Sequence, residues 1–381
     1  MKIAQVTPYD FHHPGGVAEH IGHLREEFIK LGHEVVVIAP RSTKGGIQTE
    51  DGFYGIGRTI SIPGNGSKVR LTFDVTLYNA VKELMRIEQF DVVHIHEPLT
   101  PVLGPMALLN SVAANVATFH AFRESNAWYT AFHAYMTFLL TKVDVRVAVS
   151  EPAREFVSQY FEGEYKIVPN GIDTTRFSPS LEPIERMMGR GGPNILFVGR
   201  YEEPRKGFKY LLRAMPLIRQ QFPEARLTVV GTGRPEKFDD LIAQHGIWGV
   251  DFVGTIPAGE LPRYYASCDI FCAPSIERES FGIVLLEAMA SGKPVVACDI
   301  AGYASVMKDG REGLLVPPRD PVALALAIVR LLSAPELGVR FAEQGLQTAQ
   351  RYAWPSVAER VLEIYEMARE RFAVSSRHEY E

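Results

Sequence analysis

Short apolar runs rich in β-branched residues recur along the chain and alternate with stretches of helical periodicity. The runs fall into two sets. The first set lies at 2–6, 34–38, 91–96, 115–119 and 145–150, and the second at 194–199, 226–231, 250–254, 269–274 and 294–299. Apolar strands that alternate with helices are typical of parallel sheets covered on both faces. The pattern therefore predicts an α/β protein with two doubly wound domains.

The segment between the two sets, residues 168–180, is rich in turn-forming residues and has no periodic pattern. We expect the domain boundary there, with one domain over 1–170 and a second over 171–358. A chain of 381 residues suits two domains better than one. Ligands of open α/β sheets bind beyond the carboxyl ends of the strands, so we expect a site in the cleft between the domains.

Composition narrows the class of protein. The chain is 46% hydrophobic and 22% charged, as in globular domains, and its net charge of −5 argues against nucleic-acid binding by the protein as a whole. Cys268, Cys272 and Cys298 are too few for a disulfide framework, so we expect small buried residues in a reducing compartment. No apolar run approaches the length of about 18 residues of a membrane span, and the start lacks a signal-peptide pattern, so we expect a cytoplasmic protein.

Two glycine-containing turns are candidates for binding phosphate. Gly15 and Gly16 follow the first strand and open a helix, where backbone amides can approach an anion. The spacing is not G-x-G-x-x-G, so a nicotinamide cofactor is not indicated, and an ordinary turn is the alternative. In the second domain, Arg200 and Lys206 flank a proline-containing turn before Gly207 and a helix. Two such cations suit a departing diphosphate, and a solvated basic loop is the alternative.

The stretch ESFGIVLLEAMASG, residues 279–292, holds two glutamates around a helix start. If the helix begins near Phe281 and Gly282, its first amides can bind phosphate, and Glu287 lies ~7.5 Å further along the axis. That offset suits a carboxylate that accepts hydrogen bonds from both ribose hydroxyls of a nucleotide. Glu279 could accept hydrogen bonds from the hydroxyls of a transferred sugar. The alternatives are a helix-dipole role for Glu279 with Glu287 facing solvent, or a glycosidase pair, for which the sequence offers no second acid–base site.

The histidines do not match a metal-ligand set, and the chain contains no Asp-x-Asp, so we expect no metal in the site. The groups considered are His12/His13, His20/His23 and His94/His96 followed by Glu97. His94 and His96 would share one face at a strand end, where polar packing is expected. His120 follows the strand at 115–119, and its position leaves a structural and a catalytic role both open.

Several motifs occur in order along nearly the whole chain: PGGVAEHI, HIHEP, ATFH, VPNGID, GRYEEPRKG and ESFGIVLLEAMA. Together they resemble the retaining glycosyltransferases of the GT-B class, the large family that includes glycogen and sucrose synthases and bacterial mannosyltransferases. Within it, the chain resembles the phosphatidylinositol mannosyltransferases through MKIAQVTPYDFHHPGGV, IPGNGSKVRL and FVGRYEEPRKG. The resemblance implies two Rossmann-like domains, with residues 359–381 crossing back to the first.

The resemblance also implies the chemistry of the site. The donor would be GDP-mannose, held mainly by the second domain, and transfer would retain the anomeric configuration without a tightly bound metal or cofactor. The implied catalytic residues are His120 near the reacting sugar, Arg200 and Lys206 at the diphosphate, and Glu279 at the sugar hydroxyls. The implied donor-binding residues are Gly15, Gly16, Arg200, Arg205, Lys206, Val253, Glu279, Phe281, Gly282, Ile283, Val284 and Glu287. On the acceptor side the match falls on Tyr9, Asn65 and Arg70.

We therefore expect a hexosyltransferase of glycolipid biosynthesis that moves mannose to a membrane lipid such as phosphatidylinositol. Departures from the family pattern at Ala18, Gly64 and Ser125 leave the acceptor open. A UDP-sugar transferase acting on diacylglycerol or a soluble acceptor, a nucleotide-sugar 2-epimerase and a non-catalytic nucleotide-sugar-binding protein are the alternatives.

A lipid acceptor implies contact with a membrane, expected at an anionic inner face of the plasma membrane. Residues 77–86 have amphipathic helical spacing with Lys82 and Arg86 on the polar side, and residues 122–140 are dense in aromatics. Packing of both helices on the domain core is the alternative for each.

Overall fold

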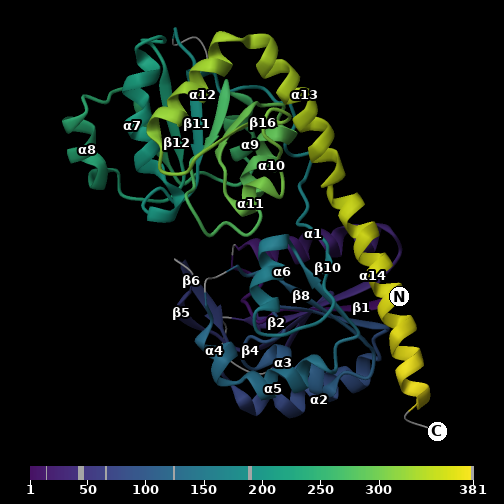
Figure 1. The fold of residues 1–381 in the computed structure, drawn as a ribbon. Helices are drawn as coiled ribbons and strands as arrows, with labels where there is room; N and C mark the ends of the chain where they lie inside the picture. The colour runs from purple at the N-terminus through teal and green to yellow at the C-terminus, as the bar shows by residue number, and fades with distance from the viewer. Residues whose placement is uncertain (14, 42–46, 65–66, 123–124, 188–190, 379–381) are drawn as a thin grey trace. The chain divides into compact units, whose positions relative to one another are not determined.

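The structure, a computed structural model, describes residues 1–13, 15–41, 47–64, 67–122, 125–187 and 191–378. The chain forms two compact domains (Figure 1), the N-domain of Met1–Asn170 with Trp354–Glu381, and the C-domain of Gly171–Ala353. The return to the N-domain thus begins at Trp354, not at 359 as expected. The physical reason is burial, since Trp354, Val357 and Ala358 pack in the N-domain core.

The N-domain is built on an eight-stranded sheet of order β10-β9-β8-β7-β1-β2-β4-β3. Its pairings are parallel except for the antiparallel pair β3 and β4. The strands are β1 (Lys2–Val6), β2 (Glu34–Arg41), β3 (Ile47–Glu50), β4 (Phe53–Arg58), β7 (Val92–His96), β8 (Ala114–Phe119), β9 (Val145–Ala148) and β10 (Lys166–Ile167). A separate hairpin pairs β5 (Ile60–Gly64) with β6 (Ser67–Leu71).

Helices cover both faces of this sheet (Figure 1), which is why the residues of its central strands are almost all buried. The helices are α1 (Gly16–Lys30), η1 (Val75–Leu77), α2 (Tyr78–Glu88), α3 (Leu103–Asn110), α4 (Ala127–Ala131), α5 (His133–Leu140), α6 (Glu151–Ser158) and α14 (Trp354–His378). Leu24 and Phe28 of α1 pack with Val357 and Val361 of α14 in one core cluster. Helices α2, α3, α5 and α6 contribute to another.

The apolar face of α2 is part of that core. Val81, Leu84 and Met85 are buried in it, so this face is not available to a lipid surface. For residues 77–86 the structure therefore favours the alternative of core packing over the membrane-binding interpretation.

The C-domain contains a six-stranded parallel sheet of order β13-β12-β11-β14-β15-β16. Its strands are β11 (Asn194–Val198), β12 (Arg226–Val230), β13 (Val250–Gly254), β14 (Ile270–Ala273), β15 (Val295–Cys298) and β16 (Gly313–Val316). Its helices are η2 (Glu185–Met187), η3 (Pro204–Lys206), α7 (Phe208–Arg219), η4 (Pro235–Phe238), α8 (Asp239–Gln244), α9 (Leu261–Ala266), α10 (Ile283–Ala290), α11 (Ala301–Ala304), α12 (Pro321–Ser333) and α13 (Pro335–Arg351).

The strand order of the C-domain reverses between β11 and β14. At such a switch point the loops after the two strands diverge and leave room for a ligand at the carboxyl edge. Both loops hold candidate residues from the sequence, Arg200–Gly207 after β11 and Pro274–Gly282 after β14. The fold thus assigns the donor-side motifs to one edge of one sheet.

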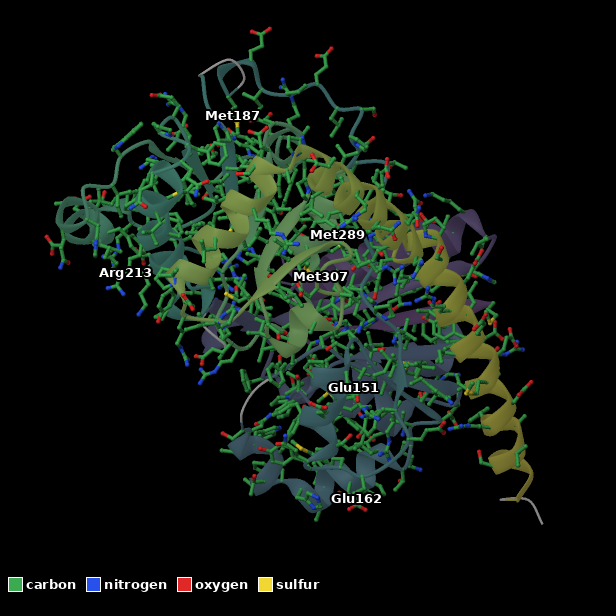
Figure 2. The ribbon with its side chains drawn as sticks, turned by 45° about the horizontal axis from the view of Figure 1, so that its top comes forward. Glu151, Glu162, Met187, Arg213, Met289 and Met307 are labelled. Carbon is green, nitrogen blue, oxygen red and sulfur yellow. The ribbon has the colours of Figure 1, made fainter. Side chains whose placement is uncertain are left out.

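The C-domain core fixes the helix that starts beside this edge. Met289 of α10 is fully buried with Met307 (Figure 2), and a Cβ built on Gly345 of α13 would lie 3.1 Å from Met289 Cγ.

The three cysteines are free and buried, as expected. Among the described residues, no individual helix combines the length and apolar composition needed to cross a bilayer, while α12 and α13 together do so with a 100° bend between them.

The variant Gly231→Ala tests the close approach of two C-domain loops, those that contain Gly231 and Gly199. Gly231 has a φ of +137°, and a Cβ there would lie 2.0 Å from the Gly199 carbonyl oxygen. We expect Gly231→Ala to lower the melting temperature of the C-domain by more than about 5 °C, since strained backbone costs about 1–3 kcal/mol before any clash. Differential scanning calorimetry of the full chain measures this.

Gly246→Ala is the matched control for that variant. Gly246 has a φ of +57°, and in the described part of the chain no atom lies within 4 Å of a Cβ built there. Its melting temperature should fall by about 2–4 °C, the effect of backbone strain of about 1 kcal/mol alone. Equal shifts for the two variants would show that the close approach at Gly231 is not destabilising.

Candidate functional site

Two loops of the C-domain are held together at the switch point. The Ile276 amide donates to the Arg205 carbonyl at 2.8 Å. Gly207 has a φ of +65°, and a Cβ there would lie 1.8 Å from the Pro274 carbonyl oxygen. Glycine is required at this position because both the backbone conformation and the approach of the second loop exclude a side chain.

The contact between the loops brings three predicted residues together at one carboxylate. Glu279 Oε1 accepts hydrogen bonds from Lys206 Nζ at 2.6 Å and from Arg205 Nη1 at 2.9 Å. Ser275 Oγ donates to the same oxygen at 3.0 Å. The side chains of Glu279, Lys206 and Arg205 are only 13–17% exposed, so solvent screens these ion pairs weakly.

A second carboxylate, Glu203, extends this ion-pair cluster. Its Oε2 lies 2.8 Å from Arg205 Nη2, and its Oε1 lies 2.7 Å from Arg200 Nη1. Three cations thus face two carboxylates, which leaves an excess of one positive charge. Such a cluster can accept an anion by exchanging carboxylate partners for phosphate oxygens.

Tyr303 orients Glu279 through Ser275, and sequence reasoning missed both residues. The buried Tyr303 hydroxyl donates to Ser275 Oγ at 2.8 Å. Burial, with the charge of Glu279, raises the pKa of Tyr303 well above its usual value of 10. The hydroxyl therefore stays protonated and keeps its role as donor at neutral pH. The position of Ser275 directly after β14 was the available signal for one of the two.

Two glycines allow close approaches around Glu279, Gly302 to the carbonyl of Glu279 and Gly282 to the ring of Tyr303. A Cβ built on Gly302 would lie 2.0 Å from the Glu279 carbonyl oxygen, and one on Gly282 would lie 2.7 Å from Tyr303 Cδ1. Gly282, with a φ of +106°, is the N-cap of α10. The helix begins at Ile283, close to the predicted start, and the first amides of a helix lack intrahelical acceptors.

Glu287 lies one turn into α10 and is partly buried, so it does not simply face solvent. The Tyr265 hydroxyl donates to Glu287 Oε2 at 2.6 Å. Burial and the charge of Glu287 raise the pKa of Tyr265 well above 10, which keeps this donor protonated. Val253, Ile283 and Val284, which the family resemblance also implicates, are partly buried against the same core cluster.

In the N-domain the structure brings two of the acceptor-side residues close together. Tyr9 forms an antiparallel bridge with Leu71, and the Asp10 amide donates to the Arg70 carbonyl at 3.2 Å. Asn65 lies outside the described residues. Gly15 is the N-cap of α1, and no described atom lies within 4 Å of a Cβ built on Gly16, so the backbone at this helix start is open.

Four histidines, from α1, from β7 and from the segment after β8, form a cluster at the carboxyl edge of the N-domain sheet. His96 Nδ1 lies 2.9 Å from His120 Nε2, and the rings of His20 and His120 lie 5.0 Å apart. His94 contacts Thr118 and the Tyr365 hydroxyl, which agrees with the polar packing expected for it. His20 Nδ1 lies 2.9 Å from Asn170 Oδ1.

The histidine cluster is uncharged at neutral pH. Burial lowers the pKa of His20 to about 4 and that of His94 to about 3, and it holds the pKa values of His96 and His120 well below 6.5. Nitrogens of His20, His96 and His120 all lie within 4.8 Å of one another. Sequence reasoning did not find this group, because its members lie far apart along the chain.

Comparisons with known proteins match both domains. Residues 14–176 match the family described as Glycosyltransferase Family 4, and residues 192–334 match the one described as Glycosyl transferases group 1. The phosphatidyl-myo-inositol mannosyltransferase of Mycobacterium leprae is 36% identical over 370 residues, 96% of each chain. That of Mycobacterium tuberculosis is 37% identical over 374 residues, 96% of this chain and 97% of the relative.

Solved structures agree on the fold. Anabaena HepE in complex with UDP superposes with a TM-score of 0.77 at 18% identity, covering 96% of this chain and 100% of HepE. Sucrose-phosphate synthase from Thermosynechococcus elongatus gives a TM-score of 0.72 at 20% identity, and the match covers 96% of this chain and 98% of the synthase. The predicted fold class is confirmed. The chain is a glycosyltransferase with the GT-B fold and belongs to the family that contains the phosphatidyl-myo-inositol mannosyltransferases.

Proposed function

We propose that this protein transfers mannose from GDP-mannose to an inositol hydroxyl of phosphatidylinositol, with retention of the anomeric configuration. Relatives that bear the corresponding name are 33–37% identical to it over nearly their whole length. The observation that most supports the proposal is the convergence of Lys206 and Arg205 on Glu279 at the switch point of the C-domain. In the proposal, the two cations bind the diphosphate and the carboxylate accepts hydrogen bonds from the sugar.

In the proposed reaction the bond from the anomeric carbon to the diphosphate oxygen breaks. A bond to the inositol oxygen forms on the same face of the sugar, and the hydroxyl proton passes to the departing phosphate. Charge accumulates on the diphosphate, where Arg200, Arg205 and Lys206 stabilise it. Glu279, oriented by Ser275, accepts hydrogen bonds from the sugar hydroxyls, and no metal is required for these steps.

The two domains have different parts in the proposal. The C-domain binds the nucleotide, with Glu287 at the ribose and the first turn of α10 at the phosphates. The N-domain supplies His120, Gly15 and Gly16 to the donor and Tyr9, Asn65 and Arg70 to the acceptor. The acceptor assignment is supported by the proximity of Tyr9 and Arg70, which lie at the same end of β6.

Contact with the membrane is proposed for the α4–α5 region of the N-domain. Trp128, Phe132, Tyr135 and Phe138 are 38–51% exposed, and the rings of Trp128 and Phe132 lie 3.9 Å apart. Phe132 lies between α4 and α5, and Tyr135 and Phe138 of α5 are three residues apart, the spacing of one helical face. Aromatic side chains are favoured at the boundary between headgroups and acyl chains, so these four suit a peripheral protein at an anionic inner leaflet.

A donor and acceptor panel tests the proposal as a whole. GDP- and UDP-linked mannose and glucose are offered with phosphatidylinositol, diacylglycerol or free inositol as acceptor. Mannosyl phosphatidylinositol should form from GDP-mannose with the α configuration of the donor, as judged by NMR of the anomeric proton. Preferred use of a UDP-sugar, an inverted product or epimerised donor would each refute the proposed reaction.

Glu279→Gln and Lys206→Met test the central ion pair. Each should lower kcat at least about 100-fold, because each removes charge complementarity at the reacting groups. Circular dichroism and calorimetry check that the fold is kept. Glu236→Gln and Lys237→Met are the matched controls, since both residues are exposed on η4, and they should retain wild-type rates. Near-normal turnover by either test variant would remove that residue from the mechanism.

Glu287→Gln tests the ribose contact. GDP affinity, measured by calorimetry, should fall about ten- to hundredfold, the effect of losing hydrogen bonds to a charged acceptor. The comparison with 2′-deoxy-GDP makes the test specific. The wild type should prefer GDP, whereas the variant should bind both nucleotides about equally. A preference for GDP that persists in the variant would place the ribose elsewhere.

Phe132→Ser/Phe138→Ser tests the membrane surface. The double variant should bind liposomes that contain acidic phospholipid at least about threefold more weakly in sedimentation, because half-exposed aromatic area no longer enters the bilayer. Leu326→Ser/Val339→Ser in the C-domain is the control, with exposure of 62% and 59%. Wild-type protein recovered in the supernatant at low and high salt alike would end the proposal of membrane contact.

A further inference from the structure

We propose that Gln5, His96 and Tyr365 form a hydrogen-bonded chain that fixes which ring nitrogen of His120 carries the proton. Gln5, His96 and Tyr365 are positioning residues in this proposal, since they act on the reaction through His120. The inference rests on the proposed function only for the part of His120 in sugar transfer. The chain itself is a property of the N-domain that can be measured independently.

The hydrogen bonds of the chain are continuous from β8 through β7, α14 and β1. The contacts are Thr118 Oγ1 to His94 Nε2 at 2.6 Å, His94 Nδ1 to Tyr365 OH at 2.8 Å, Tyr365 OH to Gln5 Nε2 at 2.8 Å, Gln5 Oε1 to His96 Nε2 at 2.7 Å and His96 Nδ1 to His120 Nε2 at 2.9 Å. Gln5, His94 and His96 are at most 1% exposed, so water does not compete for these bonds. A buried network of this kind is costly to leave partly satisfied.

The orientation of the Gln5 amide decides the direction of the bonds from Gln5 through His96 to His120. Its nitrogen donates to Tyr365, so its oxygen must accept from His96 Nε2–H. A neutral imidazole carries one proton, and His96 Nδ1 is therefore bare. The proton between His96 and His120 then belongs to His120 Nε2, and His120 Nδ1 keeps its lone pair.

Rotation of the same amide by half a turn would reverse the chain. His96 would donate through Nδ1, and His120 would accept at Nε2 and carry its proton on Nδ1. The two states present a sugar hydroxyl with opposite partners, an acceptor in the first and a donor in the second. The conformation of Gln5 in the structure selects the first.

The backbone at His120 is fixed separately by Glu97. One carboxylate oxygen of Glu97 accepts from the amides of His120 and Ala121 at 2.6 and 2.7 Å. Glu97 itself has a φ of +54°, a strained conformation for a non-glycine residue. The groups that face the His96–His120 pair are His20 from α1, His94 on β7, Glu97 after β7 and Tyr365 of α14.

The distance between the two rings favours a shared proton over a shared metal ion. Two nitrogen ligands on a tetrahedral zinc ion, each bonded at about 2.0–2.1 Å, lie about 3.4 Å apart. His96 Nδ1 and His120 Nε2 are 2.9 Å apart, the separation of a hydrogen bond. The three nitrogens of His20, His96 and His120 are near one another, but this pair is arranged as a donor and an acceptor.

The ¹⁵N NMR spectrum of the full-length protein tests the chain directly. Long-range ¹H–¹⁵N correlations, assigned with His→Gln variants, should show the Nε2–H tautomer at both His96 and His120 at neutral pH. Gln5→Met removes the amide while keeping the length of the side chain, and it should give a mixture of tautomers at His120. Gln5→Glu still accepts from His96 Nε2–H and should restore the Nε2–H tautomer of His120.

Transfer kinetics should follow the tautomers. Gln5→Met should lower kcat about ten- to hundredfold with KM for the donor changed less than about threefold, as expected for a misplaced proton at a reacting group. Gln5→Glu should recover most of the lost kcat. The kcat of Tyr365→Phe should lie between those of Gln5→Met and Gln5→Glu. Tyr165→Phe is the matched control, because its buried hydroxyl donates to the Phe161 carbonyl outside the chain. It should leave both spectrum and rate unchanged.

Three results would overturn the inference. These are an Nδ1–H tautomer of His120 in the wild type, an unchanged kcat in Gln5→Met despite altered tautomers, and activity that is lost in EDTA and restored by Zn²⁺. A wild-type protein that shows the expected tautomers but no transferase activity would instead refute the proposed function. It would still support the hydrogen-bonded chain of Gln5, His96 and Tyr365.

Discussion

The ion pairs at Glu279 are the interaction on which the proposed donor site depends. In the proposed function Lys206 and Arg205 bind a diphosphate together, yet two largely buried cations without counter-ions would repel each other and lose solvation. Removing one partner of a buried ion pair costs about 3–5 kcal/mol, so the ligand-free protein needs internal anions. Glu279 and Glu203 supply them. Phosphate binding can then replace one set of oxygens by another without assembling the site anew.

This arrangement also explains the glycines around it. Gly207, Gly282 and Gly302 each lie where a Cβ would collide with Pro274, Tyr303 or Glu279. Gly207 allows the loops after β11 and β14 to approach within hydrogen-bond distance, which brings cations from one loop to a carboxylate on the other. Gly282 and Gly302 allow α11 to pack against the loop after β14. Tyr303 and Ser275 then set the rotation of that carboxylate. Geometry at Glu279 is therefore determined by close backbone packing rather than by the local helix.

Sequence alone predicted the central strands because both faces of each are buried and β-branched and other apolar residues predominate in them. It missed β3 to β6, since segments such as FYGIGR and ISIPG are interrupted by glycine or proline. Of the candidate site, it proposed Arg200, Lys206 and Glu279 because each lies in a loop that follows a strand, and Arg205 through the family resemblance. It could not identify Tyr303, 28 residues beyond Ser275, or the contacts that join His96 and His120 to Gln5 and Tyr365. Those depend on strand order and on the return of the C-terminal helix.

The two domains therefore meet their ligands with opposite electrostatics. The C-domain cluster keeps full charges close together and suits phosphate, whose affinity for cations survives partial burial. The four histidines at the carboxyl edge of the N-domain sheet are uncharged, since burial depresses their pKa values. Neutral imidazoles discriminate hydroxyl groups by the direction of a hydrogen bond, which a charged group would override. The proposed retaining transfer would use both, because the leaving group gains charge while the sugar hydroxyls only need to be oriented.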